Sequence, residues 1–459
     1  MTAVAASSLA VALSACSSTT SSTGNSTTAP GDSSAPAGSV SPGCEPYAAY
    51  MGHSGTAVSM FASILPPESD KFQASWKAFE GCTGIKVNYE GSNDFEAQLK
   101  VRVQGGTAPD LAFIPQPGLL QSMVALGKVV EAPAAVSANV DANWNKAWKS
   151  YGSVDGKFYA APLGANMKSF VWYSPTAFKT AGYTIPTTWD DLMKLSATIA
   201  TAGKAKPWCG GIGSGTATGW PSTDWLEEVV MRQAGPDVYD KWISHDVKFS
   251  DKPIIDSMNT VAGWMKNPAW VNGGYGDVKT IATTTFQDAG KPILTGKCFM
   301  LQQASFYANQ WGKKADGTPV KVAEDGDVYA FYLPAMGDTF GKPVEGGGEF
   351  VTAFSNRPEV QAVQTYLTDV SWINGKIKLG DWVTANKAID PANYQNPIDK
   401  LSWTDLTDPA ATFRFDASDL MPAAVGAGEE WKQMTSWFAD DKPTADVAKA
   451  IDAAWPAAG

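Results

Sequence analysis

From Thr56 onward, segments typical of β-strands alternate along the chain with segments typical of amphipathic helices. The segment "IKVNY" alternates apolar and polar residues with the period of two that a half-buried strand requires. Between residues 94 and 104, Phe95, Leu99 and Val103 recur at helical spacing and form one apolar face. Such alternation is typical of parallel sheets that carry helices on both faces. We therefore expect an α/β protein.

Local turn and cap signals support this assignment. A helix is expected to begin near Glu68 and to end at Gly81, and Thr188 with Asp191 forms a capping box for another helix. Asp155-Gly156 predicts a tight turn before the extended segment "LGANMKSFVWYSPTAF". Two more extended segments, "TGKCFMLQQASF" and "GGGEFVTAFSNRPEV", connect blocks of different composition. Three such passages in 459 residues predict two α/β lobes joined by several crossings.

The N-terminal segment predicts export. Residues 1–15 are apolar and too short to span a bilayer, but they have the length of a secretory signal and end in small residues. The sequence "LSAC" resembles a bacterial lipobox, in which Cys16 becomes the lipidated first residue of the mature protein. Residues 16–45 are rich in Ser, Thr and Pro and predict a flexible tether. We therefore expect a lipid-anchored protein on the extracytoplasmic face of the cell membrane.

The remaining cysteines predict disulfides. Apart from Cys16, the chain contains Cys44, Cys82, Cys209 and Cys298. An even number of cysteines in an exported chain favours disulfides, and pairing the first with the second and the third with the fourth requires the least topological assumption. A zinc site is the alternative, but no cysteine pair has C-x-x-C spacing and His53 and His245 are the only histidines. We expect two disulfides and no metal.

The composition of the chain and the motifs that it lacks exclude several classes of function. A formal net charge of -11 disfavours contact with nucleic acid or with anionic lipid head groups. The scarcity of histidine and the lack of a G-x-S-x-G motif argue against nucleophilic catalysis by serine or cysteine. No Gly-Lys pair is followed by Ser or Thr, so the chain has no phosphate loop of the nucleotide-hydrolase kind. No cofactor is expected, and the partner should be neutral, cationic or a protein.

The stretch "CGGIGSGTATGWPSTDWLEEVV", residues 209–230, points to a neutral ligand. Thr216 stands where the third glycine of a dinucleotide fingerprint would be, and Trp220 and Asp224 follow the glycines. A sugar ring has an apolar face and an edge of hydroxyls, so a sugar site combines aromatic rings with planar hydrogen-bonding groups. The glycines allow a ligand to approach the backbone, and the helix start that follows offers free N–H donors.

Four segments resemble the solute-binding proteins of ATP-driven sugar importers, in the branch that binds α-glucosides. They are "PDLAFIPQPGLL", "NMKSFVWYSPTAF", "GTATGWPSTDWLEE" and "DLMPAAVGAGEEWKQM". The resemblance runs from about Thr56 to Trp437 and includes the placement of Cys209 and Cys298. It implies a two-lobed periplasmic-binding-protein-like fold of type II with a ligand cleft between the lobes.

The same resemblance implies where the lobes divide. Three hinge crossings are expected near Leu163–Met167, Leu301–Ser305 and Phe350–Phe354. The first lobe is then expected to comprise residues 46–164 and 304–350. The second lobe is expected to comprise residues 165–303 and 351–459.

Trp431 and Trp220 are the favoured candidates for stacking against a sugar. Each follows a run of small residues and stands outside a helical stripe, whereas Trp76, Trp189 and Trp264 lie in stripes and are expected in the core. By resemblance, Trp431 is the platform under the bound sugar. Core packing is the alternative role for Trp431 and for Trp220.

Six further residues are candidates for ligand contact: Gln116, Asn166, Asp94, Asp224, Phe306 and Glu349. Gln116 follows a buried strand at its carboxyl end, where open α/β sheets bind ligands, although a turn amide is an equal alternative. Asn166 and Glu349 lie beside expected crossings. Asp94 is chosen by resemblance, although it could serve as a helix cap, and capping is the favoured role of Asp224.

Two functions are compatible with these residues. The favoured hypothesis is a monomeric receptor that captures an oligosaccharide such as maltose, sucrose or trehalose and delivers it to the permease subunits of an importer. The alternative is an exported glycoside hydrolase, which would also combine aromatic rings with carboxylates about 5 to 10 Å apart. Glu227 and Glu228 are adjacent on an expected helix and point in different directions, so they do not form such a pair.

Overall fold

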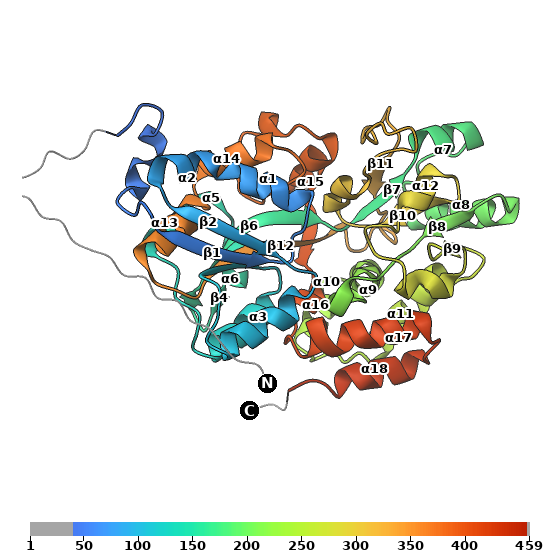
Figure 1. The fold of residues 1–459 in the computed structure, drawn as a ribbon. Helices are drawn as coiled ribbons and strands as arrows, with labels where there is room; N and C mark the ends of the chain where they lie inside the picture. Colours follow the sequence, from blue (N-terminus) through green and yellow to red (C-terminus); the bar gives the residue numbers. More distant parts are fainter. Residues whose placement is uncertain (1–39, 457–459) are drawn as a thin grey trace, which may run out of the picture.

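The computed structural model describes residues 40–456 and shows two α/β lobes, each built on its own sheet (Figure 1). The first sheet has the strand order β13-β12-β3-β1-β2, with β6 paired to β12. The second sheet has the order β11-β7-β10-β8-β9. The two-lobed fold of type II that the sequence predicted is therefore confirmed. Within the described residues, no helix combines the length and the apolar composition needed to cross a membrane.

The strands are short apart from β12. Those of the first sheet are β1 (Ala57–Ala62), β2 (Lys86–Gly91), β3 (Leu111–Ile114), β6 (Ala160–Met167), β12 (Lys342–Ala353) and β13 (Ala411–Phe415). Those of the second sheet are β7 (Phe170–Tyr173), β8 (Lys206–Cys209), β9 (Val271–Asn272), β10 (Cys298–Gln302) and β11 (Tyr329–Tyr332). A small hairpin, β4 (Ser153–Val154) and β5 (Lys157–Phe158), turns at Asp155-Gly156 as predicted.

The parallel pairing in the first sheet determines where a ligand can bind. β1 pairs in parallel with both β2 and β3, so the carboxyl ends of these strands meet at one edge. Ser63, Asn93 and Pro115 come shortly after the three strands, and all three line the cleft described below. Loops at the carboxyl ends of parallel strands are the usual ligand sites of open α/β sheets.

Helices cover the sheets of both lobes. The first lobe carries α1 (Glu68–Ser75), α2 (Lys77–Thr83), α3 (Phe95–Gln104), α4 (Pro117–Ala125), α5 (Ala134–Asn143), α6 (Lys146–Tyr151), α13 (Pro358–Tyr366), α14 (Val370–Lys378) and α15 (Pro397–Thr407). The second carries α7 (Pro175–Ala181), α8 (Trp189–Ala202), α9 (Trp220–Gln233), α10 (Pro236–Ile243), α11 (Lys252–Met265), α12 (Lys291–Leu294), α16 (Ala417–Leu420), α17 (Trp431–Ala439) and α18 (Thr444–Asp452). Six short helical turns complete the fold: η1 (Glu45–Tyr50), η2 (Gly215–Ala217), η3 (Val278–Ala282), η4 (Ser305–Gln310), η5 (Pro391–Asn393) and η6 (Val425–Glu430).

Most of the local signals lead to the elements expected from them. In α8, the Thr188 hydroxyl accepts a hydrogen bond from the Asp191 backbone N–H at 3.1 Å, as the capping box requires. The single helix predicted from Glu68 to Gly81 is instead two helices that meet at Trp76. The second of them ends at Gly84, whose φ of 72° provides the left-handed C-cap.

The chain passes directly between an element of one lobe and an element of the other at three places within residues 40–456. These are Lys168–Ser169 after β6, residues 333–341 after β11, and Asp416 after β13. The crossing expected near Leu301–Ser305 is not among them, because β10 and β11, the strands before and after it, both pair with β7 in the second sheet. The crossing expected at Phe350–Phe354 is wrong, because Phe350 pairs with Ile114 of β3 inside the first sheet. The glycine-rich first half of β12 has the composition of a linker, but it pairs with β13 on one side and, from Gly346 onward, with β6 on the other.

The predicted lobe boundaries differ from the observed sheets in the last third of the chain. Residues 329–332, assigned to the first lobe, pair with β7 in the second sheet. Residues 358–366 and 411–415, assigned to the second lobe, contact the first sheet through β1 and β12. The difference arises because β12 continues through the expected crossing, so that the chain stays in the first lobe until Asp416.

Two hydrophobic clusters form the interior. The first surrounds the first sheet and reaches one face of the second sheet, where it includes Trp172 and Trp311. The second packs α8, α9 and α11 against α17 and α18, so that the C-terminal helices complete a lobe built mainly from the middle of the chain (Figure 1). Trp76 belongs to the first cluster, and Trp189 and Trp264 to the second, as their helical spacing predicted.

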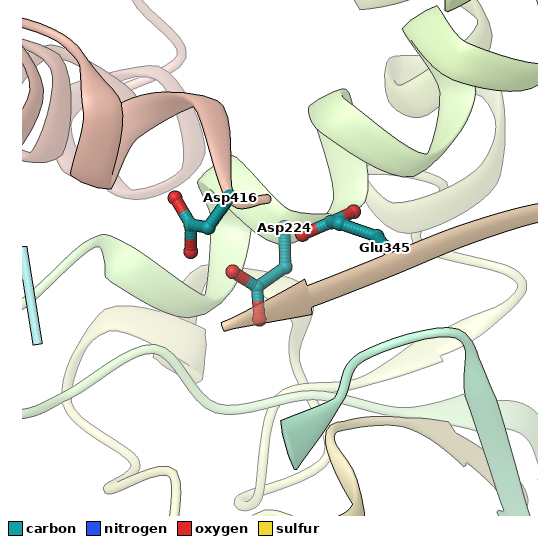
Figure 2. A group of neighbouring side chains, drawn as sticks. All are labelled: Asp224, Glu345 and Asp416. Atoms are coloured by element: carbon teal, nitrogen blue, oxygen red, sulfur yellow. The ribbon is translucent and has the colours of Figure 1, made fainter. Parts of the chain in front are cut away.

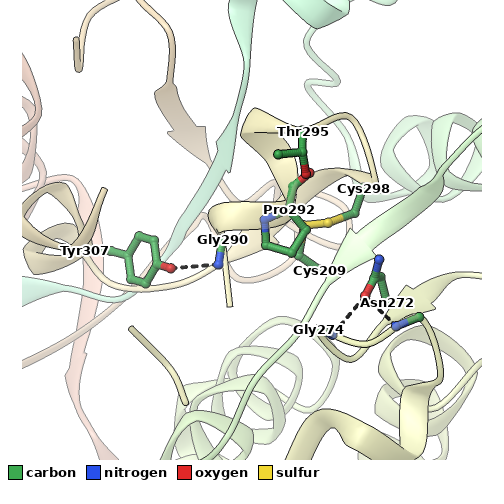
Figure 3. The surroundings of a disulfide bond; sticks show 9 residues. Cys209, Asn272, Gly274, Gly290, Pro292, Thr295, Cys298 and Tyr307 are labelled. Atoms are coloured by element: carbon green, nitrogen blue, oxygen red, sulfur yellow. Dashed lines mark hydrogen bonds between the residues drawn. A yellow bond between two sulfur atoms is a disulfide. The ribbon is translucent and has the colours of Figure 1, made fainter. Parts of the chain in front are cut away.

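Both predicted disulfides are present. Cys44 is bonded to Cys82, and Cys209 is bonded to Cys298. The second bond links the ends of neighbouring strands β8 and β10 in the second lobe (Figure 3). Closing a loop by a disulfide restricts the unfolded chain, so both bonds stabilise an exported protein.

Candidate functional site

A cleft of about 280 Å3 lies between the two lobes. Its lining comes from the carboxyl ends of first-sheet strands, from β12, and from the starts of α9 and α17 in the second lobe. Six of the eight residues predicted to contact a ligand line this cleft: Gln116, Asn166, Trp220, Phe306, Glu349 and Trp431. Their individual roles in binding stay predictions, but the fold brings them to one place.

Three aromatic rings form a group on the second-lobe wall of the cleft. The ring centroid of Trp220 lies 5.1 Å from that of Phe286 and 6.0 Å from that of Phe306. The rings of Phe286 and Phe306 are 6.1 Å apart and nearly perpendicular. All three side chains are partly exposed and line the cleft, so their faces are available to the apolar face of a sugar.

Trp431 begins α17 and lines the same cleft. Its side chain is 5% exposed, and it belongs to neither hydrophobic cluster of the described residues. Gly219 explains how Trp431 and Trp220 come together, because a Cβ at Gly219 would lie 2.2 Å from the Trp431 carbonyl oxygen. The glycine therefore permits the start of α9 to pack on the start of α17.

Several polar atoms in the cleft lining have no hydrogen-bond partner within the described part of the chain. They are Asn166 Oδ1, Gln116 Oε1, Asp399 Oδ2 and Trp431 Nε1. Buried polar groups are nearly always hydrogen-bonded in folded proteins. Three of these atoms are acceptors and one is a donor, and a ligand with several hydroxyl groups can satisfy both kinds.

Asp94 and Asp224 do not belong to the cleft lining. Asp94 lies just before α3, and its Oδ1 accepts a hydrogen bond from the Thr216 backbone N–H at 3.3 Å, which links the two lobes. Asp224 does not cap its helix, so the expected capping role is wrong. α9 begins at Trp220, and Asp224 therefore lies inside the helix, where it is 1% exposed and bound to Lys168.

Lys168 is the centre of a buried ionic cluster at the hinge. Its Nζ donates a hydrogen bond of 2.7 Å to Asp224 Oδ1 and contacts Asp416 Oδ2. Asp224, Asp416 and Glu345 approach one another from three different elements, with carboxylate oxygens within 4.8 Å of one another (Figure 2). Such spacing would suit a metal ion, but the ammonium of Lys168 already supplies a positive charge to two of the three.

The buried helix α9 connects all three passages between the lobes. Its Asp224 binds Lys168 at the first passage. Its Arg232 donates hydrogen bonds to the backbone carbonyls of Leu333 and Pro334 in the second passage. Its Glu227 accepts hydrogen bonds from backbone N–H groups just after the third passage, at Ala417 and Ser418. A movement of one lobe against the other must therefore work through the contacts of this helix.

Burial changes the acidity of the cluster. It raises the pKa of Asp224 to about 8, although the nearby ammonium opposes the shift. Burial also raises the pKa of Glu345 well above its usual range, and both carboxylate oxygens of Glu345 lack a hydrogen-bond partner within residues 40–456. Although burial disfavours a charged lysine, Asp224 and Asp416 raise the pKa of Lys168, so its ammonium stays charged.

Three residues of the first-lobe wall of the cleft were not predicted from the sequence. Glu68, Trp382 and Asp399 line its first-lobe side, next to the predicted Glu349. Glu68 was explained as part of a helix start. Trp382 follows Gly380 by two positions, much as Trp431 follows Gly428 by three, so a glycine signal that could have pointed to Trp382 was present but was not used. Trp382 Nε1 donates a hydrogen bond to Glu349 Oε1 at 3.2 Å, a contact between residues 33 positions apart.

Comparison with known sequences identifies relatives over most of the chain. A family model described as bacterial extracellular solute-binding protein matches residues 65–390. The osmoprotective compounds-binding protein GgtB of Synechocystis sp. is 32% identical over 402 residues, which are 87% of this chain and 92% of that protein. The alpha-glucosides-binding periplasmic protein AglE of Rhizobium meliloti is 32% identical over 414 residues, which are 87% of each chain.

Solved structures of similar fold also cover nearly the whole chain. A chitin oligosaccharide binding protein matches with a TM-score of 0.72 at 16% identity, over 88% of this chain and 98% of that chain. The bacterial solute receptor AcbH, reported to prefer β-D-galactopyranose, matches with a TM-score of 0.71 at 19% identity, over 87% of this chain and 98% of that chain. At these identities the likeness establishes the fold.

Proposed function

The chain belongs to the bacterial extracellular solute-binding proteins, and we propose that the solute it captures between its lobes is an α-glucoside. It is a solute receptor of an ABC importer for sugars, and it acts outside the cytoplasm. Its relatives are binding proteins, so the chain is not an enzyme, and the glycoside hydrolase hypothesis is not favoured. Capture and delivery to the permease subunits require no covalent chemistry.

The combination of aromatic rings and unpartnered polar atoms in one cleft carries this proposal. Trp220 and Trp431 on one wall and Trp382 on the other offer apolar surfaces for sugar rings. Asn166 Oδ1 and Gln116 Oε1 offer acceptors for sugar hydroxyls. A volume of about 280 Å3 is near the lower end of small-molecule sites, which are about 300 to 1,000 Å3, and fits a short oligosaccharide.

The α-glucoside assignment is supported by the relative from Rhizobium meliloti, whose name states that it binds alpha-glucosides. It is also supported by the motif that contains Trp431, which resembles the stacking platform of that branch. In the mechanism that we propose, the protein is a monomer whose lobes close on the sugar about the passages at Lys168, residues 333–341 and Asp416.

A thermal-shift panel tests the ligand class directly. The purified protein is heated with maltose, trehalose or sucrose, and cellobiose serves as the control because it differs from maltose only in the configuration of the glycosidic bond. A ligand at 100 times its dissociation constant stabilises the folded state by about 2.7 kcal/mol. We expect at least one α-linked sugar to raise the melting temperature and cellobiose to leave it unchanged. Equal or greater stabilisation by cellobiose contradicts the proposal.

We also propose that Cys16 carries a lipid anchor, although this residue lies outside the described part of the chain. Stable membrane attachment takes about two acyl signals, which lipoprotein processing supplies. The Cys16→Ala variant is expected to move from the membrane fraction to the soluble exported fraction, whereas the control variant Ser17→Ala stays with the membrane. Immunoblots of fractionated cells measure this. An unchanged membrane fraction for Cys16→Ala rules the anchor out.

A further inference from the structure

The first-lobe wall of the cleft is acidic. Glu68 of α1, Glu349 of β12 and Asp399 of α15 all line it. Within the described residues, Lys168 is the one cationic side chain in the cleft lining, and its ammonium is already bound to Asp224 and Asp416. In the described cleft lining, no cationic side chain is therefore free to pair with the carboxyl groups of the first-lobe wall.

The hydrogen bonds of these carboxyl groups are incomplete. Glu349 Oε1 accepts the bond from Trp382 Nε1. Asp399 is 2% exposed, and its Oδ2 has no hydrogen-bond partner within residues 40–456. Leaving a buried carboxylate oxygen without a donor is unfavourable. Because Asp399 lines the cleft, a bound ligand is in a position to provide the donor.

The positive charges near this wall lie behind it. Lys71 is paired with Asp381. Lys376 is fully buried, with its Nζ 4.5 Å from the ring centroid of Phe72 and 5.1 Å from that of Trp382. The Lys376 ammonium has no hydrogen-bond partner in the described part of the chain. It offsets part of the negative charge of Glu68 and Glu349, but it is not part of the cleft lining.

From this arrangement we propose that the cleft prefers a saccharide that carries a protonated amine, held by Glu68, Glu349 and Asp399. The inference rests on the proposed sugar-binding function and narrows its ligand class. An ammonium group has three N–H donors and no acceptor, which matches the oxygen atoms of carboxyl groups that ionise when the amine binds. Hydrogen bonds between ionised partners are about twice as strong as those between neutral groups. A neutral sugar can occupy the same cleft, but it does not form these stronger hydrogen bonds between ionised partners.

The acidity of the wall supports the proposal and adds a second measurement. Burial, followed by the nearby Glu349, raises the pKa of Glu68 to about 8, and burial raises the pKa of Asp399 to about 7. At pH 7 Glu68 is therefore mostly protonated, and Asp399 is protonated in about half of the molecules. An ammonium bound beside them lowers both pKa values, so binding of the amine releases protons. The charged or titratable groups that face them are Lys71, Tyr89, Glu349, Lys376, Asp381 and Tyr394.

Calorimetry with matched sugar pairs tests the inference. Maltose and trehalose are compared at pH 7 with their monoamino-deoxy derivatives, and with the N-acetylated forms of those derivatives, which lack the charge. We expect at least one amine to bind tenfold more tightly than its neutral parent, and acetylation to abolish the gain. Repeating the titration in buffers of different ionisation enthalpy is expected to show net proton release for the amine and none for the parent.

Substitutions in the first-lobe wall test which side chains cause the preference for the amine. Asp399→Asn and Glu349→Gln are expected to reduce the ratio of amine to parent affinity at least threefold. Lys376→Met removes the buried ammonium behind Trp382 and is expected to increase that ratio. Glu96→Gln is the matched control, because Glu96 lines the cleft from α3 and already accepts a hydrogen bond from Gln116. This variant is expected to keep the ratio of amine to parent affinity unchanged.

If the parents bind and no amine binds more tightly, this inference fails while the proposed function stands. If neither parent and no amine binds, the inference fails, and the proposed function is overturned as well when sucrose also fails to bind.

Discussion

Replacing Lys168 with methionine is expected to lower the free energy of unfolding by about 3 to 5 kcal/mol at pH 8, the usual cost of removing one partner from a buried ion pair. The variant leaves Asp224 and Asp416 buried, at 1% and 3% side-chain exposure, without the ammonium that compensates them. It also removes the link between the first passage and α9. Chemical denaturation followed by tryptophan fluorescence measures the loss.

Lys149→Met is the matched control for this prediction. The distance from Lys149 Nζ to its partner Asp141 is also 2.7 Å, but the two side chains are 25% and 61% exposed. Pairs of this kind contribute about 0 to 1 kcal/mol. If the Lys168 and Lys149 variants lose the same small amount, the buried cluster does not stabilise the hinge.

The loss in the Lys168 variant is expected to depend on pH. Burial raises the pKa of Asp224 to about 8, whereas carboxyl groups in an unfolded chain titrate near about 4. Between these values the native state holds protons that the unfolded state has released, so the free energy of unfolding falls as the pH rises. Without the ammonium this proton binding is stronger. We therefore expect the deficit to be small at pH 5 and to grow towards pH 8.

Trp431→Ala is expected to weaken binding of the best α-glucoside at least tenfold while the ligand-free protein stays folded. A buried aromatic residue at a binding site often accounts for about 2 kcal/mol or more of the binding free energy. Trp431 lines the cleft and lies outside both hydrophobic clusters, so truncation enlarges the cleft and leaves the packed interior intact. Calorimetry measures the affinity, and chemical denaturation measures the stability.

Trp264→Ala provides the contrast. The Trp264 ring packs at 5.3 Å from Trp189 and 5.1 Å from Trp208 inside the second cluster, and its removal is expected to cost about 3 to 5 kcal/mol of stability. If Trp431→Ala behaves like Trp264→Ala and leaves the affinity unchanged, Trp431 is a core residue. The stacking ring would then be sought at Trp220 or Phe306.

Much of the fold could be predicted because its signals are local. The helical stripe of Phe95, Leu99 and Val103 led to α3, in which all three side chains are buried. The turn at Asp155-Gly156 and the capping box at Thr188 also act within a few residues. Such patterns depend on periodicity and backbone conformation, which the sequence contains directly.

The lobe boundaries after residue 304 could not be read in the same way. β12 extends for 12 residues across the expected crossing, and its glycines have the composition of a loop. Its pairing with β3 and β6 depends on strands far away in the sequence. β-strand formation depends strongly on neighbouring strands, so local composition misplaced the crossing.

The candidate site was likewise only partly predictable from the sequence. By itself the sequence determined that Trp220 and Trp431 stand beside small residues, that four cysteines were available to pair, and that the chain has no phosphate loop of the nucleotide-hydrolase kind. Only the tertiary structure decided that Asp224 lies inside a helix beside Lys168, and that Lys168 also contacts Asp416, which is 248 positions away. It likewise decided that Glu68, Trp382 and Asp399 form the opposite wall. The reason is that the charge state and the partners of a carboxyl group depend on burial and on distant neighbours, and neither leaves a periodic pattern in the chain.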